Sequence, residues 1–134
     1  MLLSLLAATL ALAFAPTRYA TMETTFATGF YEPSRSATLA VSYNEDGSPQ
    51  RITLAVSGRK FTADVWRTYN SRCGNRIDAR LSVPNDRVST NLELLDYSSV
   101  RCRIYAKHKW RARVNTWEAD GSESRLELEG DPRD

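Results

Sequence analysis

The chain has 134 residues, with 18 Lys and Arg against 16 Asp and Glu, and a net charge of +2. A charge this small does not by itself indicate a nucleic-acid or membrane partner, so no specific nucleic-acid ligand is expected. Two cysteines without a Cys-x-x-Cys spacing, a single histidine and the lack of a glycine-rich phosphate loop exclude the common zinc and nucleotide sites, and no cofactor is expected.

The N-terminal segment is apolar and uncharged from Leu2 to Ala15. It is shorter than the roughly 20 residues of a membrane-spanning helix, and it has the composition of the apolar core of a secretory signal peptide. We expect residues 1–20 to be this signal, cleaved after Ala13 or as late as Ala20; an uncleaved helix at a membrane interface is the alternative. The mature chain would be secreted or periplasmic, without a transmembrane segment and with one domain over residues 21–134.

The rest of the chain alternates apolar and polar residues, as is typical of β-strands. A first strand is expected around Gly29, with residues 17–23 as a disordered lead-in and Pro33 at its end. Clusters of turn-forming residues separate the later apolar runs. These further expected strands are residues 38–43, 51–56, 61–66, 77–83, 88–94, 101–117 and 124–130.

The expected pairing keeps the apolar residues of neighbouring strands on one face. In the first hairpin this places Tyr43 opposite Ile52. Across the next turn it places Phe61 opposite Val56. Trp66 then points outward, either as an exposed contact residue for a sugar or a protein or covered by a neighbouring segment.

The stretch from Arg101 to Trp117 alternates between a mostly apolar set and a set with six positive charges and no negative one. One straight strand of this length would reach roughly 55 Å at about 3.3 Å per residue. Ordinary strands are much shorter, so we expect a bend or break near residues 107–109.

The C-terminal hairpin is predicted by turn chemistry, apolar pairing and charge together. A three-residue loop over residues 119–121 places Gly121 where a left-handed conformation is favoured. The resulting register sets Val114 opposite Leu126 and Ala112 opposite Leu128 on the inner face. On the outer face it sets Arg113 opposite Glu127 and Arg111 opposite Glu129.

Short sequential connections between eight strands predict an all-β fold: a small antiparallel meander that closes as an eight-stranded barrel, with a β-sandwich as the alternative. In a meander Cys73 and Cys102 lie at the same end, and paired cysteines are usual in exported domains. We expect one disulfide between them, closing a loop of about 30 residues and stabilising the fold by roughly 3–4 kcal/mol. Large inward side chains such as Leu39 and Trp110 predict a filled centre.

The strongest functional signal is the set of outward residues between Arg101 and Trp117, which we call the basic stretch. Charge combined with aromatic surface suits anionic partners such as polyanionic glycans, lipid head groups or nucleic acid. Alternatively, the C-terminal strand neutralises part of the charge. The candidate ligand-binding residues are Arg101, Arg103, Tyr105, Lys107 and Lys109. We expect an exported binding domain of the cell envelope or extracellular space, with an anionic polymer or a protein as its partner.

No catalytic motif is present, so an enzyme is not expected. His108 is the single histidine, and without a Gly-x-Ser-x-Gly nucleophile we expect a structural or loop role for it. Outward carboxylates could form a glycosidase pair, but solvated or ion-paired roles are expected for them. These carboxylates are Asp64, Asp78, Glu93, Glu127 and Glu129.

The segment Ser57-Gly58-Arg59-Lys60-Phe61 resembles the Ser-Gly-x-x-aromatic segment of the periplasmic C-type lysozyme inhibitors. That family consists of small disulfide-bearing barrels that insert a loop into the lysozyme cleft. The resemblance implies an alternative function, a periplasmic inhibitor of a secreted enzyme such as lysozyme, with Ser57, Gly58 and Lys60 in the inhibitory loop. The likeness covers five residues, and the Lys-Gly pair that follows the segment in that family is absent.

Overall fold

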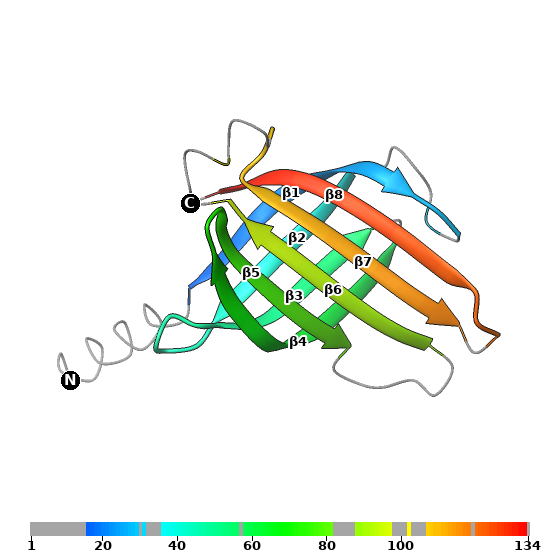
Figure 1. The fold of residues 1–134 in the computed structure, drawn as a ribbon, viewed down its shortest axis with the longest axis horizontal. Coiled ribbons are helices and arrows are strands. Elements are labelled where there is room, and N and C mark those ends of the chain that lie inside the picture. Colours follow the sequence, from blue (N-terminus) through cyan, green and yellow to red (C-terminus); the bar gives the residue numbers. More distant parts are fainter. Residues whose placement is uncertain are drawn as a thin grey trace, which may run out of the picture.

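The computed structural model describes residues 16–29, 31, 36–56, 58–81, 88–97, 102, 107–118 and 120–133. Its strands are β1 (Thr17–Ala27), β2 (Ser36–Tyr43), β3 (Pro49–Val56), β4 (Arg59–Ser71), β5 (Gly74–Leu81), β6 (Val88–Asp96), β7 (Trp110–Glu118) and β8 (Glu123–Arg133). Each strand pairs antiparallel with the next, and the closed sheet is the predicted eight-stranded meander barrel rather than the sandwich (Figure 1). In the part of the chain that the structure describes, no helix is long and apolar enough to cross a membrane.

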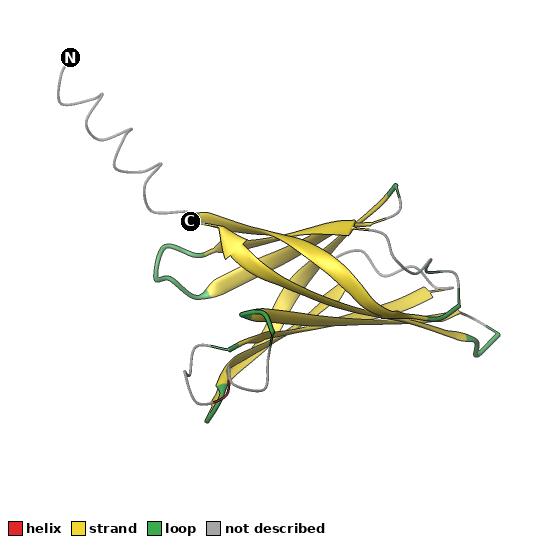
Figure 2. Ribbon diagram, turned by 90° about the horizontal axis from the view of Figure 1, so that it is seen from above, coloured by secondary structure: helices red, strands yellow, loops and turns green. Residues whose placement is uncertain are grey.

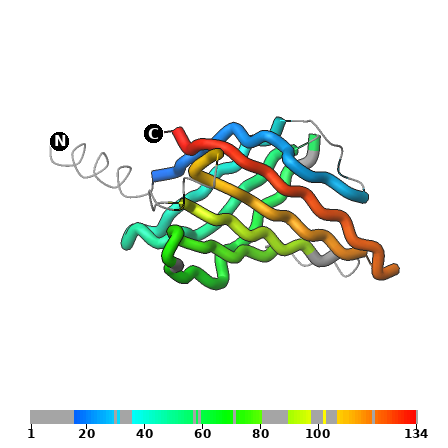
Figure 3. Tube along the Cα trace, turned by 45° about the horizontal axis from the view of Figure 1, so that its top comes forward, coloured from blue at the N-terminus to red at the C-terminus, as the bar shows by residue number. Residues whose placement is uncertain are grey.

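The barrel closes where β1 pairs antiparallel with β8. Figure 3 shows β8 running between β7 and β1, and Figure 2 shows the sheet curving around on itself. The register between β1 and β8 shifts between Thr24 and Phe26, which marks a bulge. Closure gives β1 and β8 hydrogen-bonded neighbours on both sides and so removes the free edges of the sheet.

The barrel interior is filled over most of its length by alternate residues of the strands. Leu39 and Trp110, predicted to point inward, are both fully buried. Eight strands leave an interior just wide enough for side chains to fill. The buried side chains from β1, β3 and β6–β8 include Ala20, Met22, Ile52, Leu54, Leu92, Leu94, Ala112, Val114, Leu126 and Leu128.

One end of the barrel, which we call the closed end, is covered by Tyr31. Tyr31 is buried, and its hydroxyl lies 3.0 Å from Oγ1 of Thr116, which in turn lies 3.3 Å from Oγ1 of Thr90. The ring of Tyr31 also meets the ring of Phe61 edge-on, with centroids 6.5 Å apart. These contacts fill the interior between Tyr31, Phe61 and Thr116 with paired polar groups and aromatic packing.

The N-terminal expectation needs correction. Residues 17–23 are not a disordered lead-in, because they pair with β2 on one side and with β8 on the other. The first strand ends at Ala27, ahead of Gly29 rather than around it. The alternation of buried Ala20 and Met22 with exposed neighbours is the signal for this strand.

The two predicted registers in the first half of the chain are wrong by two residues. Val41, not Tyr43, is opposite Ile52, and Val56 is opposite Arg59 rather than Phe61. The connections are tighter than expected: Gly47 with φ +86° and Gly58 with φ +73° let the chain reverse in fewer residues. A shift of two residues keeps every side chain on its predicted face, so the inward set is unchanged.

The C-terminal hairpin has the predicted register throughout. Val114 pairs with Leu126, Ala112 with Leu128 and Arg113 with Glu127. Its loop is closed by a hydrogen bond from the amide of Gly121 to the carbonyl of Glu118, and Gly121 has the expected positive φ of +87°. The basic stretch breaks where expected, because β7 begins at Trp110 and residues 107–109 form a bend.

The predicted disulfide between Cys73 and Cys102 is formed, with the two Cα atoms 5.1 Å apart. It joins the β4–β5 turn to the connection between β6 and β7. Both lie at the end of the barrel opposite the closed end. We call this the open end; it also contains the start of β1 and the β2–β3 turn (Figure 1).

Candidate functional site at the open end

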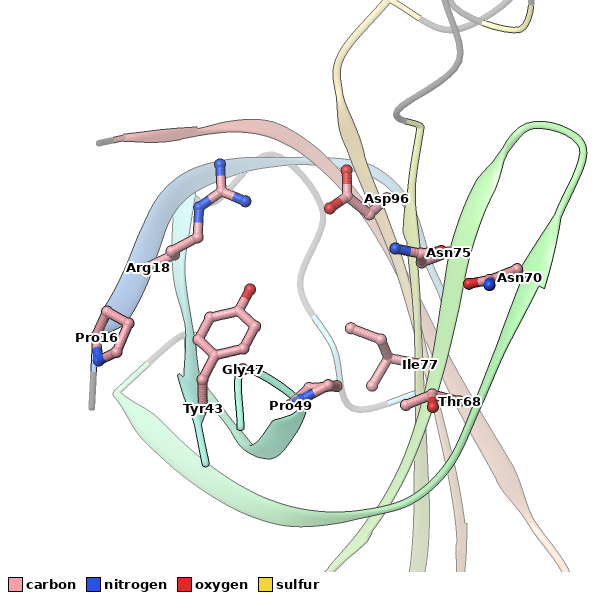
Figure 4. A pocket seen from close by; sticks show the side chains of 10 residues that line it. All are labelled: Pro16, Arg18, Tyr43, Gly47, Pro49, Thr68, Asn70, Asn75, Ile77 and Asp96. Atoms are coloured by element: carbon pink, nitrogen blue, oxygen red, sulfur yellow. The ribbon is translucent and has the colours of Figure 1, made fainter. Parts of the chain in front are cut away.

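The interior of the barrel ends in a cavity of about 410 Å³ at the open end. Its walls come from strands β1 to β6 and the β2–β3 turn, and the lining combines charged, amide, hydroxyl and apolar groups (Figure 4). The lining residues are Pro16, Arg18, Tyr43, Gly47, Pro49, Thr68, Asn70, Asn75, Ile77 and Asp96. The volume falls within the range of roughly 300–1,000 Å³ that is typical of small-molecule sites.

Arg18 lines the cavity from β1, on the same inward face of the strand as Ala20 and Met22. Its guanidinium carbon lies 5.5 Å from the centroid of the Trp110 ring, a cation–π distance. Tyr43 lies beside it on the same wall (Figure 4). Burial raises the pKa of the Tyr43 phenol, although a hydrogen bond and the charge of Arg18 oppose the shift. The phenol is therefore neutral at physiological pH, and the guanidinium is the charged group of this wall.

Asp96 faces Arg18 from the last position of β6 (Figure 4). It continues the inward parity of Leu92 and Leu94, so a carboxylate stands where the pattern would place another apolar side chain. Nζ of Lys109 lies 3.9 Å from Oδ1 of Asp96, an ion pair that is too long for a hydrogen bond. Arg18 and Asp96 bring opposite charges to the cavity, and Lys109 compensates part of the negative charge of Asp96.

Buried polar atoms without a hydrogen-bond partner gather near the cavity. Within the described residues three such side-chain atoms are found: Oδ1 of Asp96, Nε1 of Trp110 and Nε2 of His108. All three lie where β6 ends and β7 begins. Native structures leave few buried polar groups unsatisfied, so each of these atoms needs an explanation, for which a bound water is the simplest.

His108 is tied to the end of β8. Its Nδ1 lies 2.9 Å from Oδ2 of Asp131, and the backbone amide of Lys109 donates to Oδ1 of the same carboxylate at 2.9 Å. One aspartate therefore holds the bend that precedes β7. This geometry fits the structural role expected for His108.

The structure describes only two of the five candidate ligand-binding residues. Lys107 and Lys109 lie at the open end, with Lys107 exposed and Lys109 partly buried. Arg101, Arg103 and Tyr105 lie outside the described residues. Both lysines precede β7, which begins at Trp110, and Nζ of Lys109 lies 3.9 Å from Oδ1 of the cavity residue Asp96.

A second cluster lies on the outer surface of β4 and β5. Trp66 is 47% exposed and sits at a register shift between Val65 and Arg67. The guanidinium carbons of Arg80 and Arg67 lie 4.1 and 4.5 Å from the centroid of its ring. Of the two expectations for Trp66, outward exposure is the observed one. Because of the bulge, Trp66 and Arg67 both point outward, which a period of two does not predict.

The outward carboxylates are largely ion-paired, as expected. Asp64 pairs with Arg51, Glu127 with Arg113, and both Asp78 and Glu93 with Arg76. Burial works against the charge of Arg76, but its hydrogen bond to Asp78 and the charge of Glu93 outweigh it, so the pKa of Arg76 is raised. Glu129 differs, because no ion pair with Arg111 forms among the described side chains. Among those residues, no group of three or more His, Cys, Asp and Glu is placed to hold a metal ion.

The proposed inhibitor segment lies at the opposite end of the barrel from the cavity. Gly58 is exposed in the β3–β4 turn, Lys60 is exposed as the second residue of β4, and Ser57 lies outside the described residues. The turn is two residues shorter than a Ser57–Lys60 loop, because Val56 pairs with Arg59.

Arg18 and Asp96 are not among the residues predicted from the sequence. Arg18 lies in the segment expected to be a disordered lead-in, and Asp96 lies two residues beyond the expected strand 88–94. Each of the two is a charged residue two positions from a buried residue of the same strand, so alternation places its side chain on the inward face. A charge at a core position costs free energy unless it is paired or used, so such positions indicate a site.

Comparison of the chain with protein-family models, with curated proteins and with solved structures finds no match.

Proposed function

We propose that the protein is an exported, non-enzymatic binding domain that takes a small ligand into the cavity at its open end. The observation that carries this proposal is the difference between the two barrel ends. At the closed end the buried Tyr31 occupies the interior with its hydroxyl hydrogen-bonded to Thr116, whereas the open end has a cavity of about 410 Å³ lined in part by charged groups. Small-molecule sites combine a largely preformed hollow with a few converging polar groups in this way.

Export is supported by the disulfide, which is compatible with a periplasmic or extracellular location. Cleavage after Ala20 would remove the first four residues of β1, Arg18 among them. We therefore expect the signal to be cut ahead of Pro16, so that the mature chain keeps its cavity. Intact-mass measurement of the exported protein gives the position of the cut.

Filling the cavity tests the proposal. Thr68→Trp places a large side chain at the cavity wall, whereas Thr38→Trp makes the same change on an exposed position of β2. A small-molecule library screened by ligand-observed NMR should yield binders of the wild type and of Thr38→Trp that Thr68→Trp no longer binds. A library without binders, or binders that Thr68→Trp retains, would contradict the proposal.

Positive charge near the cavity supports an anionic component of the ligand or a polymeric anion approaching this end. Arg18, Lys107 and Lys109 supply it within the described residues. An Arg103→Ser/Lys107→Ser variant should then elute from a heparin column at lower salt than the wild type, because fewer phosphate-like contacts are made. Unchanged elution would remove the polymeric anion from consideration.

Enzyme inhibition is the second candidate, and the exposure of Gly58 in the β3–β4 turn and of Lys60 at the start of β4 favours it. This function uses the closed end, so it is separable from ligand binding. Lysozyme should be inhibited by the wild type and by Thr68→Trp but not by a Ser57→Ala/Lys60→Ala variant. Absence of inhibition by the wild type would end this alternative.

A further inference from the structure

We infer that the outer surface of strands β4 to β7 binds an acidic segment of a protein partner. These strands are consecutive neighbours in the barrel wall (Figure 1). Their outward side chains point away from the ligand cavity, so the inference does not rest on the proposed function. The residues that form this arginine–aromatic surface are Trp66, Arg67, Tyr69, Arg76, Arg80 and Arg111.

Arginine and aromatic side chains alternate along this surface. The guanidinium carbons of Arg80 and Arg67 lie 4.1 and 4.5 Å from the centroid of the Trp66 ring. The guanidinium carbons of Arg67 and Arg76 each lie 5.2 Å from the centroid of the Tyr69 ring. These distances are within the range of cation–π interactions, so the rings and the guanidinium groups restrain one another.

Two of the arginines are also held by the buried carboxylate of Asp78. Arg67 and Arg76 each form an ion pair with it, at 2.8 and 3.1 Å. Side chains that are held in place before binding lose less conformational entropy when a partner docks. The two ion pairs therefore prepare the aromatic rings above them for contact with a partner.

Arg80 and Arg111 carry the positive charge that a partner can use. Both are exposed, and neither forms an ion pair or a side-chain hydrogen bond within the described residues. The planar guanidinium of arginine matches the geometry of a carboxylate and binds it with two hydrogen bonds. Aspartate or glutamate side chains are thus the complementary groups for these two positions.

A hollow of about 210 Å³ beside Arg111 offers a place for one such side chain. Its charges are otherwise compensated, because Glu93 pairs with Arg76, and Arg113 pairs with Glu127. The volume is below the roughly 300–1,000 Å³ of small-molecule sites and fits a single side chain of a larger partner. The lining residues are Arg76, Glu93, Leu95, Arg111, Ala112 and Arg113.

The exposed rings favour a protein partner over a polymeric anion. Polyanions bind mainly through the number of cations that they neutralise, and Arg80 and Arg111 supply only two free ones here among the described residues. Trp66 and Tyr69 are 47% and 38% exposed and can pack against apolar groups of a partner. Trp, Tyr and Arg are the residue types enriched at binding hot spots between proteins.

The experiment uses random peptides of about twelve residues, displayed on phage, as the probe. They are selected on the wild-type protein, and the best peptide is synthesised and titrated by fluorescence anisotropy. We expect the selected sequences to be enriched in Asp and Glu. Replacing these residues of the peptide by Asn and Gln should weaken its binding about tenfold, because the pairs with arginine are lost. This comparison uses the wild-type protein alone, so it stands even if a variant fails to fold.

One pair of variants tests the aromatic contact. Trp66→Ala should weaken the best peptide about tenfold, as truncation of a hot-spot residue does. Phe26→Ala is the matched control, because Phe26 is 45% exposed on β1. It should leave the affinity within about twofold of the wild type.

A second pair of variants tests the charge. Arg80→Gln/Arg111→Gln should bind the acidic peptide about tenfold more weakly than the wild type does. It should also no longer distinguish that peptide from its Asn and Gln counterpart, because the groups that pair with the carboxylates are gone. Arg125→Gln/Arg133→Gln removes the same charge from β8 and should retain both the affinity and the distinction.

Several outcomes overturn the inference. A selection without binders, binders without acidic residues, or a peptide that Trp66→Ala binds as tightly as the wild type would each do so. Heparin retention that Arg80→Gln/Arg111→Gln loses, without selection of acidic peptides, would assign the surface to a polymeric anion. Self-association of the wild type in the analytical ultracentrifuge that Trp66→Ala abolishes would assign it to a second copy of the chain. Ligand binding in the cavity, tested by Thr68→Trp, is independent of all these outcomes.

Discussion

Arg67 donates two hydrogen bonds to a single carboxylate oxygen of Asp78, from Nε at 2.9 Å and from Nη2 at 2.8 Å. The other oxygen accepts from Nε of Arg76 at 3.1 Å. The Asp78 side chain lies on the outer face of β5. It is nevertheless only 4% exposed, because the two arginines cover it.

Removing this charge should destabilise the protein. We expect Asp78→Asn to lower the free energy of unfolding by about 2–3 kcal/mol, since hydrogen bonds to a charged, buried partner are lost and two arginines are left facing each other. Urea denaturation at neutral pH measures the loss. Asp64→Asn is the matched control, because its pair with Arg51 is about half exposed on both sides and should matter by no more than about 1 kcal/mol. Equal losses in the two variants would show that the arginine cover of Asp78 has no energetic importance.

Gly130 should be intolerant of any side chain. It lies opposite Met22 and Trp110, and a Cβ there would stand 2.3 Å from the carbonyl oxygen of Thr21. Gly130→Ala must displace β1 or β8, so we expect it to unfold at a far lower urea concentration than the wild type, or not to accumulate in folded form. Gly121→Ala is the comparison, since its Cβ meets open space and only its positive φ is penalised, by about 1–2 kcal/mol. A Gly130→Ala protein as stable as Gly121→Ala would contradict the close packing of β1 against β8.

The disulfide should be present in the exported protein and should contribute to its stability. Mass spectrometry without reductant is expected to show the loss of two hydrogens. A Cys73→Ser/Cys102→Ser variant should lose about 3–4 kcal/mol in the chain-entropy model, because the bond joins residues separated by 29 positions. Two freely alkylated thiols in protein from an oxidising compartment would exclude the bond.

Two hairpin turns should give the protein part of its acid sensitivity. Both turns contain the sequence Asp-Gly-Ser. In the first turn Asp46 accepts hydrogen bonds from the hydroxyl and the amide of Ser48, and in the second turn Asp120 accepts the corresponding bonds from Ser122. The bonds from these serines lower the pKa of Asp46 and of Asp120.

The sign of the effect follows from the lowered pKa values. The stabilising contribution is complete above the unfolded-state pKa of about 3.9 and is lost as the pH falls through the lower, folded-state value. We therefore expect an Asp46→Asn/Asp120→Asn variant to lose stability at neutral pH and to depend less on pH in acid than the wild type. Glu45→Gln removes a carboxylate from the first turn without touching these bonds and is the control. Carboxyl titration by NMR that finds ordinary pKa values for both aspartates would contradict the prediction.

The sequence by itself determined the all-β class, the sequential antiparallel strand order, the disulfide and the C-terminal hairpin, and it favoured a closed barrel over a sandwich, a choice that the structure decided. Each depended on local information: a period of two in apolar residues, glycine in turns, and complementary charge at Arg113 and Glu127. These signals agree with one another at the C-terminal hairpin, and there the predicted register is confirmed to the residue. Where only apolar alternation was available, as for Val41 and Ile52, the face was right and the register was two residues off, because a shift of two leaves the pattern unchanged.

Only the tertiary structure decided where the candidate site lies. Arg18 and Asp96 are 78 positions apart in the sequence and belong to β1 and β6, so their approach depends on closure of the barrel through β8 and on the register of several hairpins. The bulge at Trp66 likewise reverses the parity of β4 and brings Arg67 to the outer surface while Thr68 joins the cavity wall. Alternation in one strand indicates which way a side chain points, but the three-dimensional arrangement of all eight strands determines which side chains it meets.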